Sequence, residues 1–168
     1  MKAEIQFLHC GEQLQKVFAG EISEIASVVD AVKWSEVFEH SENNTVSQHQ
    51  TAYNKALARN FRGLGWEPFP MLRKDPRLIG DFRKGMVFVE IQFGNSATLY
   101  RDFYKFQYGL WNGLLSLAVL IVPMKAGAFF PTRLESVRNM AEFALARSYF
   151  TVLAINVPTM LIGLQPMD

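Results

Sequence analysis

The chain has 168 residues and a mass of 19.1 kDa, which is the size of one domain. Hydrophobic residues make up 49% of it and charged residues 20%, which excludes a disordered, collagen-like or low-complexity protein. The formal net charge of +1 conceals two opposite parts: residues 1–50 hold three Lys/Arg against eight Asp/Glu, and residues 51–168 hold fourteen against eight. The total charge therefore gives no hint of a partner, whereas the uneven distribution of charge along the chain is a clue to function.

The cysteine count and the apolar stretches of the chain indicate the cellular compartment. A single cysteine, Cys10, excludes an internal disulfide and favours a reducing compartment. The first eight residues alternate apolar with charged or polar side chains and lack the apolar core of a signal peptide. The most apolar stretch, residues 114–124, is too short to span a bilayer and is interrupted by Pro123. We therefore expect a soluble, cytoplasmic protein without a membrane partner.

The first half of the chain is predicted to be mainly helical. Apolar residues at helical spacing predict a helix over residues 20–38. Residues 41–50 are nearly devoid of apolar side chains and predict a surface loop. A second helix follows and is expected to end near the glycines of residues 63–65. After a proline-rich loop, the β-branched and aromatic run 86–93 predicts a strand.

The second half alternates helices and strands. A helix is predicted after residues 94–96, and residues 117–122 form a strand that is apolar on both faces. Residues 133–147 predict a further helix, with a Thr-x-x-Glu capping box beginning at Thr132, and residues 149–163 are strand-like. The pattern predicts one α/β domain over the whole chain, in which a central mixed sheet is flanked by helices on both faces.

The strand over residues 86–93 carries polar side chains that a buried strand ordinarily lacks. Alternation places Glu90 and Gln92 side by side on one face, where a buried unpaired carboxylate would cost several kcal/mol. If residues 82–85 turn the chain, Asp81 returns beside Glu90. Two carboxylates with an adjacent amide form an oxygen-rich site of the kind that Mg²⁺ prefers. The alternative stays open that Glu90 and Gln92 lie on an exposed edge and that Asp81 caps a turn.

Two helices carry basic residues at helical spacing. Lys55, Arg59 and Arg62 recur at i, i+4 and i+7 on the second helix. Arg101 and Lys105 recur at i and i+4 on the third. Such stripes suit contacts with phosphates, although a solvated helix face has the same pattern.

Residues 80–95, GDFRKGMVFVEIQFGN, closely resemble the catalytic segment of the BglII and BstYI type II restriction endonucleases. That family has an Asp, a Glu nine residues later and a Gln two residues after the Glu, and Asp81, Glu90 and Gln92 occupy these positions. The resemblance extends over most of the chain through ordered landmarks at residues 9–11, 22–30, 54–66, 122–125 and 157–164.

The resemblance implies a restriction-endonuclease-like core in which Gln replaces the usual Lys of the PD-(D/E)XK motif. Asp81 and Glu90 would then bind Mg²⁺ through their carboxylates and Ile91 through its backbone carbonyl. Gln92 would help to orient the attacking water, and hydrolysis would leave 5′-phosphate and 3′-hydroxyl ends. The family has a further polar active-site residue after the Trp, for which Glu67 is the nearest candidate here.

The resemblance also implies which residues read the bases of double-stranded DNA. Asn95 and Ser96 match one reading loop, and residues 130–133, with Thr132 and Arg133, match a second. Helix capping is the alternative role for Asn95, Ser96 and Thr132. The family-based expectation is a palindrome with a GATC centre. A palindrome implies a homodimer, with an interface on residues 97–113 or 133–147.

Three other functions fit the same sequence. A DNA-binding protein of this fold that has lost catalysis would bind DNA without cutting it. A nuclease acting on damaged or branched DNA would use the same core without sequence specificity. A metal-free ligand-binding α/β protein would require the Glu90 face to be exposed.

Overall fold

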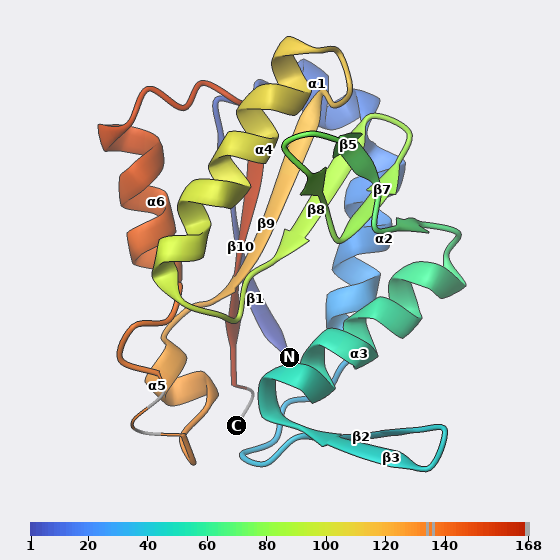
Figure 1. Cartoon of the computed structure of the whole chain (residues 1–168), viewed down its shortest axis with the longest axis vertical. Coiled ribbons are helices and arrows are strands. Elements are labelled where there is room, and N and C mark those ends of the chain that lie inside the picture. The colour runs from blue at the N-terminus through green and yellow to red at the C-terminus, as the bar shows by residue number, and fades with distance from the viewer. Residues whose placement is uncertain (134, 136, 167–168) are drawn as a thin grey trace.

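The computed structural model describes residues 1–133, 135 and 137–166. Its centre is a six-stranded sheet (Figure 1). From one edge to the other, the sheet contains β1 (Lys2–Leu8), β10 (Thr159–Gln165), β9 (Leu117–Pro123), β8 (Val87–Ile91), β7 (Phe82–Lys84) and β4 (Glu67–Pro68). The three middle strands β10, β9 and β8 are parallel, and the outer strands pair antiparallel with their neighbours. The sheet is therefore mixed, as predicted.

Helices cover both faces of this sheet (Figure 1). Helices α2 (Ala19–Asp30) and α3 (His49–Gly63) pack with Val89, Val119 and Ile121 on one face. On the other face, α4 (Leu99–Trp111) and α6 (Phe143–Val152) pack with Phe88 and Leu120. Neighbouring residues of β8 and β9 thus point into different cores, which is why both strands are apolar on both faces. The predicted fold class is confirmed.

Short elements connect these layers. They are α1 (Glu12–Val17), β5 (Met71–Arg73), β6 (Leu78–Ile79), η1 (Ser96–Thr98) and α5 (Ala126–Phe129). In the part of the chain that the structure describes, no helix is long and apolar enough to cross a membrane.

The polar segment predicted as a loop is a β-hairpin. Strands β2 (Glu39–Glu42) and β3 (Thr45–Gln48) pair antiparallel, and two residues connect them. These residues, Asn43 and Asn44, have φ values of 49° and 61°. A two-residue hairpin turn with positive φ at both positions is the type that asparagine favours.

Three predicted boundaries are wrong. The first helix ends at Asp30 and not at residue 38, and the last helix begins at Phe143 and not at residue 133. Of the predicted range 133–147, residues 134 and 136 lie outside the described part. Residues 137–139 form turns, and the neighbouring Met140 makes a β-bridge with Asn95. The predicted Thr132 capping box therefore has no helix to cap, and the final strand begins only at Thr159.

Candidate active site

The β7–β8 hairpin brings Asp81, the residue before β7, beside Glu90 on β8. Phe82 pairs with Val89, so Asp81, one residue before Phe82, lies opposite Glu90, one residue after Val89. The backbone N–H of Ile91 donates a hydrogen bond of 2.7 Å to Oδ2 of Asp81. This bond fixes the Asp81 carboxylate at the end of β8.

Gly80, the residue before Asp81, lets the backbone pass close to the ring of Phe88. A Cβ atom at Gly80 would lie 2.0 Å from Cζ of the buried Phe88 ring. No side chain fits there, because real Cβ atoms do not approach a ring so closely. The ring of Phe88 thus packs directly against the backbone that presents Asp81.

Both carboxylates have raised pKa values. Burial raises the pKa of Glu90 well above its ordinary value, the negative charge of Asp81 adds to the rise, and Lys105 opposes it. Burial also raises the pKa of Asp81, while the Ile91 N–H and Lys105 lower it. Groups of this kind gather at functional sites, where a cation or a proton compensates the buried charge.

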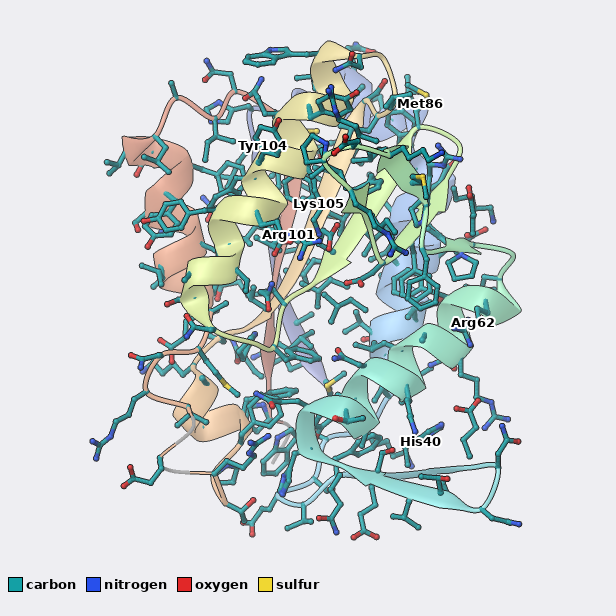
Figure 2. The ribbon with its side chains drawn as sticks, in the orientation of Figure 1. His40, Arg62, Met86, Arg101, Tyr104 and Lys105 are labelled. Carbon is teal, nitrogen blue, oxygen red and sulfur yellow. The ribbon has the colours of Figure 1, made fainter. Side chains whose placement is uncertain are left out.

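Lys105 supplies a cation from α4. Its Nζ lies 2.8 Å from Oε1 of Glu90 and 2.9 Å from Oδ1 of Asp102. Burial acts to lower the pKa of Lys105, but the charges of Glu90 and Asp102 outweigh this and raise it. The prediction that Lys105 forms an exposed stripe with Arg101 is wrong, because Arg101 is exposed and Lys105 is only 5% exposed. In Figure 2, Lys105 lies between its helix and the sheet.

Gln92, two residues after Glu90, is held at both ends of its amide. Its Nε2 donates a hydrogen bond of 2.8 Å to Oδ2 of Asp102, and its Oε1 accepts one of 2.9 Å from the backbone N–H of Gly94. Asp102 therefore connects Gln92 with Lys105.

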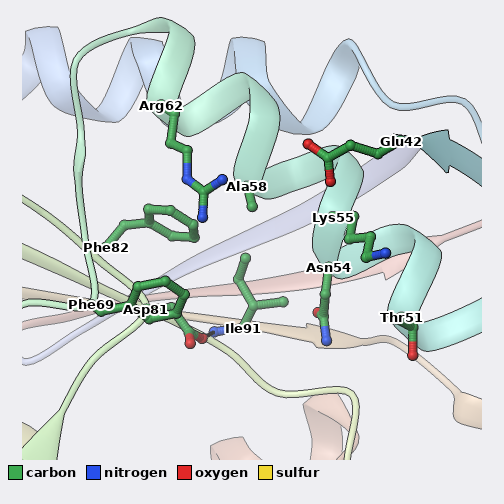
Figure 3. A pocket seen from close by; sticks show the side chains of 10 residues that line it. All are labelled: Glu42, Thr51, Asn54, Lys55, Ala58, Arg62, Phe69, Asp81, Phe82 and Ile91. Atoms are coloured by element: carbon green, nitrogen blue, oxygen red, sulfur yellow. Dashed lines mark hydrogen bonds between the residues drawn. The ribbon is translucent and has the colours of Figure 1, made fainter. Parts of the chain in front are cut away.

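A cleft of about 410 Å³ opens beside Asp81, between α3 and the end of β8 (Figure 3). Asp81 and Ile91 line it from the sheet, and Asn54 extends into it from α3. The remaining lining residues are Glu42, Thr51, Lys55, Ala58, Arg62, Phe69 and Phe82. The cleft is thus acidic at the sheet and carries two basic side chains on the helix.

The predicted stripe on α3 is divided between two faces of the helix. Lys55 and Arg62 line the cleft with Asp81, whereas Arg59 lines a separate hollow. The Nζ of Lys55 donates a hydrogen bond of 2.7 Å to the hydroxyl of Ser47, and the guanidinium of Arg62 lies 6.0 Å from the ring centre of Phe69. Phosphate contacts near Asp81 would come from Lys55 and Arg62 rather than from all three.

The two loops that resemble base-reading loops, at residues 95–96 and 130–133, are held by hydrogen bonds to other parts of the chain. Oδ1 of the exposed Asn95 accepts a hydrogen bond of 2.9 Å from the N–H of Ala97, which caps η1. The N–H of Ser96 donates to the carbonyl of Asn139. In the second loop, the hydroxyl of Thr132 donates to the carbonyl of Glu36 and Nη1 of Arg133 donates to Oε1 of Gln50.

Gln50 connects the two loops, because its Nε2 donates to the carbonyl of Phe93, just before the first loop, and its Oε1 accepts from Arg133 in the second.

Glu67 lies away from this constellation. It forms a partly exposed ion pair of 2.7 Å with Arg83 on β7, and it does not line the cleft. The position after Trp66 that does line the cleft is Phe69, which is not polar.

The residue that the sequence reasoning missed is Asp102. It is 2% exposed and lies between Leu99 and Phe106 on the buried face of α4. A carboxylate within the apolar face of an amphipathic helix is a signal that the sequence did contain.

The side chains present fit a hard divalent cation. Oε1 of Glu90 is buried and has no hydrogen-bond partner among the described residues, its contact with Lys105 being ionic. Carboxylate and carbonyl oxygens are the ligands that Mg²⁺ takes, and few of them come from the protein. Among the described residues, no three His, Cys, Asp or Glu side chains converge on one ion. Asp81, Glu90 and the Ile91 carbonyl are the oxygen groups that could hold such an ion together with water.

Comparison with known proteins assigns the chain to a family. The family model for restriction endonuclease BglII/BglIII matches residues 3–164. Among solved structures, restriction endonuclease BglII complexed with a DNA 16-mer has the same fold, with a TM-score of 0.74 and 16% identity over 100% of this chain and 78% of that one. None of the curated proteins matches the chain. The chain therefore belongs to the BglII/BglIII restriction endonuclease family, whose members are type II site-specific deoxyribonucleases.

Proposed function

We propose that this protein hydrolyses double-stranded DNA with Mg²⁺ at a short palindrome with a GATC centre, leaving 5′-phosphate and 3′-hydroxyl ends. The observation that carries the proposal is the position of Asp81 opposite Glu90, beside a cleft that also presents Lys55 and Arg62. Family membership supports the reaction type. The GATC centre rests on the resemblance of residues 80–95 to the BglII and BstYI enzymes.

Each group at the site has a role in this reaction. Asp81, Glu90 and the Ile91 carbonyl would hold Mg²⁺, which when bound polarises the phosphate and acidifies a water. Asp81 is fixed by the Ile91 N–H, and Gln92 orients the water through the hydrogen-bonding capacity that its amide retains. Gln92 does not take up a proton, so it contributes orientation rather than general-base catalysis.

DNA would be held by the basic side chains around the cleft and by Arg101 on α4. Oδ1 of Asn95 is used in capping η1, but its amide nitrogen leaves donors for a base edge. Ser96 would add to the readout from the same loop, and Thr132 and Arg133 would complete it from the second loop. BglII was solved with a DNA 16-mer, which supports the same kind of partner here.

A palindrome has two equivalent strands, so two copies of one site cut both of them. We place the interface on residues 97–113. The exposed face of α4 presents Tyr100, Tyr104 and Trp111, of which Trp111 is 78% exposed. Exposed aromatic side chains on one helix are typical of protein interfaces.

Mapping the ends of digestion fragments tests the proposal. We expect cuts at one palindrome containing GATC, with 5′ ends that a ligase joins without prior phosphorylation. Cuts at a palindrome without GATC would overturn the recognition sequence alone. A smear without discrete bands would indicate a nuclease without sequence specificity, and DNA binding without cleavage would indicate an inactive member of the fold.

A further inference from the structure

A buried chain of polar contacts joins Glu90 on the sheet to Gln92 through helix α4. Glu90 contacts Lys105 at 2.8 Å, Lys105 contacts Asp102 at 2.9 Å, and Asp102 accepts a hydrogen bond from Gln92 at 2.8 Å. The exposed fractions of Glu90, Asp102 and Lys105 are only 4%, 2% and 5%. This series of contacts therefore begins at Glu90 on β8 and ends at Gln92, one residue after the end of β8.

Burying these three charged groups destabilises the folded state relative to an apolar contact at the same place. Each buried charge loses its hydration, and one ammonium faces two carboxylates here. Well-packed apolar residues would stabilise a helix–sheet contact at lower cost. Because these charges add little to stability, their presence indicates a role in the active site.

The two oxygens of Asp102 have separate partners. Oδ1 forms the ion pair with Lys105, and Oδ2 accepts the hydrogen bond from Gln92. Only a carboxylate offers an acceptor to both, because an amide in its place would present an N–H group to one of them. The contacts of the Asp102 carboxylate are thus with two side chains that themselves belong to the site.

Gly94 completes the restraint of Gln92. Its N–H donates to Oε1 of Gln92, and a Cβ at this position would lie 2.8 Å from the same oxygen. Asp102 therefore holds the nitrogen of the Gln92 amide and Gly94 holds its oxygen, which fixes the orientation of the amide. One amide N–H and one lone pair of the oxygen remain for a ligand.

We propose that Asp102 and Lys105 are positioning residues of the cleavage site: Asp102 orients the amide of Gln92 and the ammonium of Lys105, and Lys105 holds the carboxylate of Glu90. This inference rests on the proposed function, because positioning matters only if Glu90 and Gln92 serve hydrolysis. Residues that orient a metal ligand or a water-binding group commonly change activity by roughly 10–100-fold.

The test is a double-mutant cycle with Asp102→Asn and Gln92→Ala under single-turnover conditions. Asp102→Asn is expected to lower the rate constant of cleavage roughly 10–100-fold, with little change in DNA affinity. In the Gln92→Ala background the same substitution should change the rate less than about threefold, because its main target is gone. Additive losses would overturn the role of Asp102 in orienting Gln92, since they would mean that Asp102 acts on the rate without that amide.

A matched control and an assay independent of cleavage keep the outcomes separate. Asp30→Asn, at the exposed end of α2, makes the same change of atoms away from the site and should leave the rate unaltered. In nuclear magnetic resonance, the side-chain amide of Gln92, assigned by its loss in Gln92→Ala, should shift in Asp102→Asn and stay in place in Asp30→Asn. An inactive parent with this shift would refute the proposed function alone. An unmoved amide would overturn the positioning role whether or not the parent cleaves DNA.

Discussion

The ammonium of Lys105 lies 2.8 Å from the carboxylate of Glu90, and both groups are almost completely buried between α4 and β8. The contact joins a helix to the strand that ends at the candidate metal site. It gives Glu90 a compensating charge in the protein without metal. Several consequences for stability can be measured without any assay of cleavage.

Removal of the ammonium should destabilise the protein. Lys105→Met leaves Glu90 and Asp102 without their shared cation, and breaking a buried pair in this way costs about 3–5 kcal/mol. Chemical unfolding measures the loss. Added Mg²⁺ should restore part of it, because a divalent cation replaces the missing charge. The control Arg101→Met changes an exposed residue one turn away and should alter stability by less than about 0.5 kcal/mol. Equal effects of the two substitutions would contradict the assigned contact.

The raised pKa of Glu90 predicts a pH-dependent effect of Glu90→Gln. Above the folded-state pKa, Glu90 is ionised in both the folded and the unfolded protein, and the folded protein bears the full cost of the buried charge. Below the ordinary value of 4.5, the group is protonated in both states and the cost disappears. Glu90→Gln should therefore stabilise the fold at pH values above the folded-state pKa, with a gain that declines as the pH falls toward 4.5. It should also abolish cleavage, because a proposed metal ligand is lost. A gain that grows toward acid pH would contradict the direction of the pKa shift.

Gly80 should be intolerant of any side chain. Gly80→Ala places a Cβ 2.0 Å from the Phe88 ring, and overpacking of this kind costs about 1–3 kcal/mol. It should also slow cleavage, because Asp81 is the next residue. Phe88→Leu in the same chain should recover part of both losses by making room. Gly127→Ala, where a Cβ would meet nothing within 4 Å, is the control and should be neutral. A Gly80→Ala variant with parental stability and rate would contradict the close packing.

The division of basic residues on α3 predicts different effects on DNA affinity. Arg62→Ala should weaken binding and reduce the slope of log affinity against log salt by about one, because Arg62 lines the cleft beside Asp81. Arg59→Ala should have a smaller effect, since Arg59 faces another hollow. Fluorescence anisotropy with a labelled duplex at several salt concentrations measures both. Equal losses would restore the continuous stripe that the sequence predicted.

Local sequence patterns predicted the central elements, but the turn placed at residues 82–85 is wrong, because Phe82–Lys84 form β7 and the chain turns at residues 85–86. Helix α3, strand β8 and strand β9 follow from apolar spacing that no distant contact overrides. The missed elements depend on partners far along the chain. Strand β1 exists because it pairs with β10, and the segment before α6 is held by the Asn95–Met140 bridge instead of continuing as a helix. Residues 1–8 do alternate as a strand does, but neither the partner of β1 nor the bridge of Asn95 can be read from local spacing, because both partners lie far along the chain.

The site was predicted incompletely for a related reason. Spacing indicated that Asp81, Glu90 and Gln92 could meet, but the partners of Glu90 and Gln92 come from a helix packed across the sheet. Lys105 was interpreted as exposed because it lies at i+4 from Arg101. Its burial follows from the orientation of α4, which turns the side of Leu99, Asp102 and Phe106 toward the sheet.

Cleavage of plasmid DNA that contains GATC sites, by the parent protein and by Asp81→Asn, tests the central claim most directly. With Mg²⁺, we expect the parent to yield discrete fragments and to yield none with a chelator present. Asp81→Asn should stay folded and yield none under either condition, because one of the two carboxylates is lost. A folded parent that leaves every DNA intact with Mg²⁺, or an Asp81→Asn variant that cuts as fast as the parent, would contradict the claim.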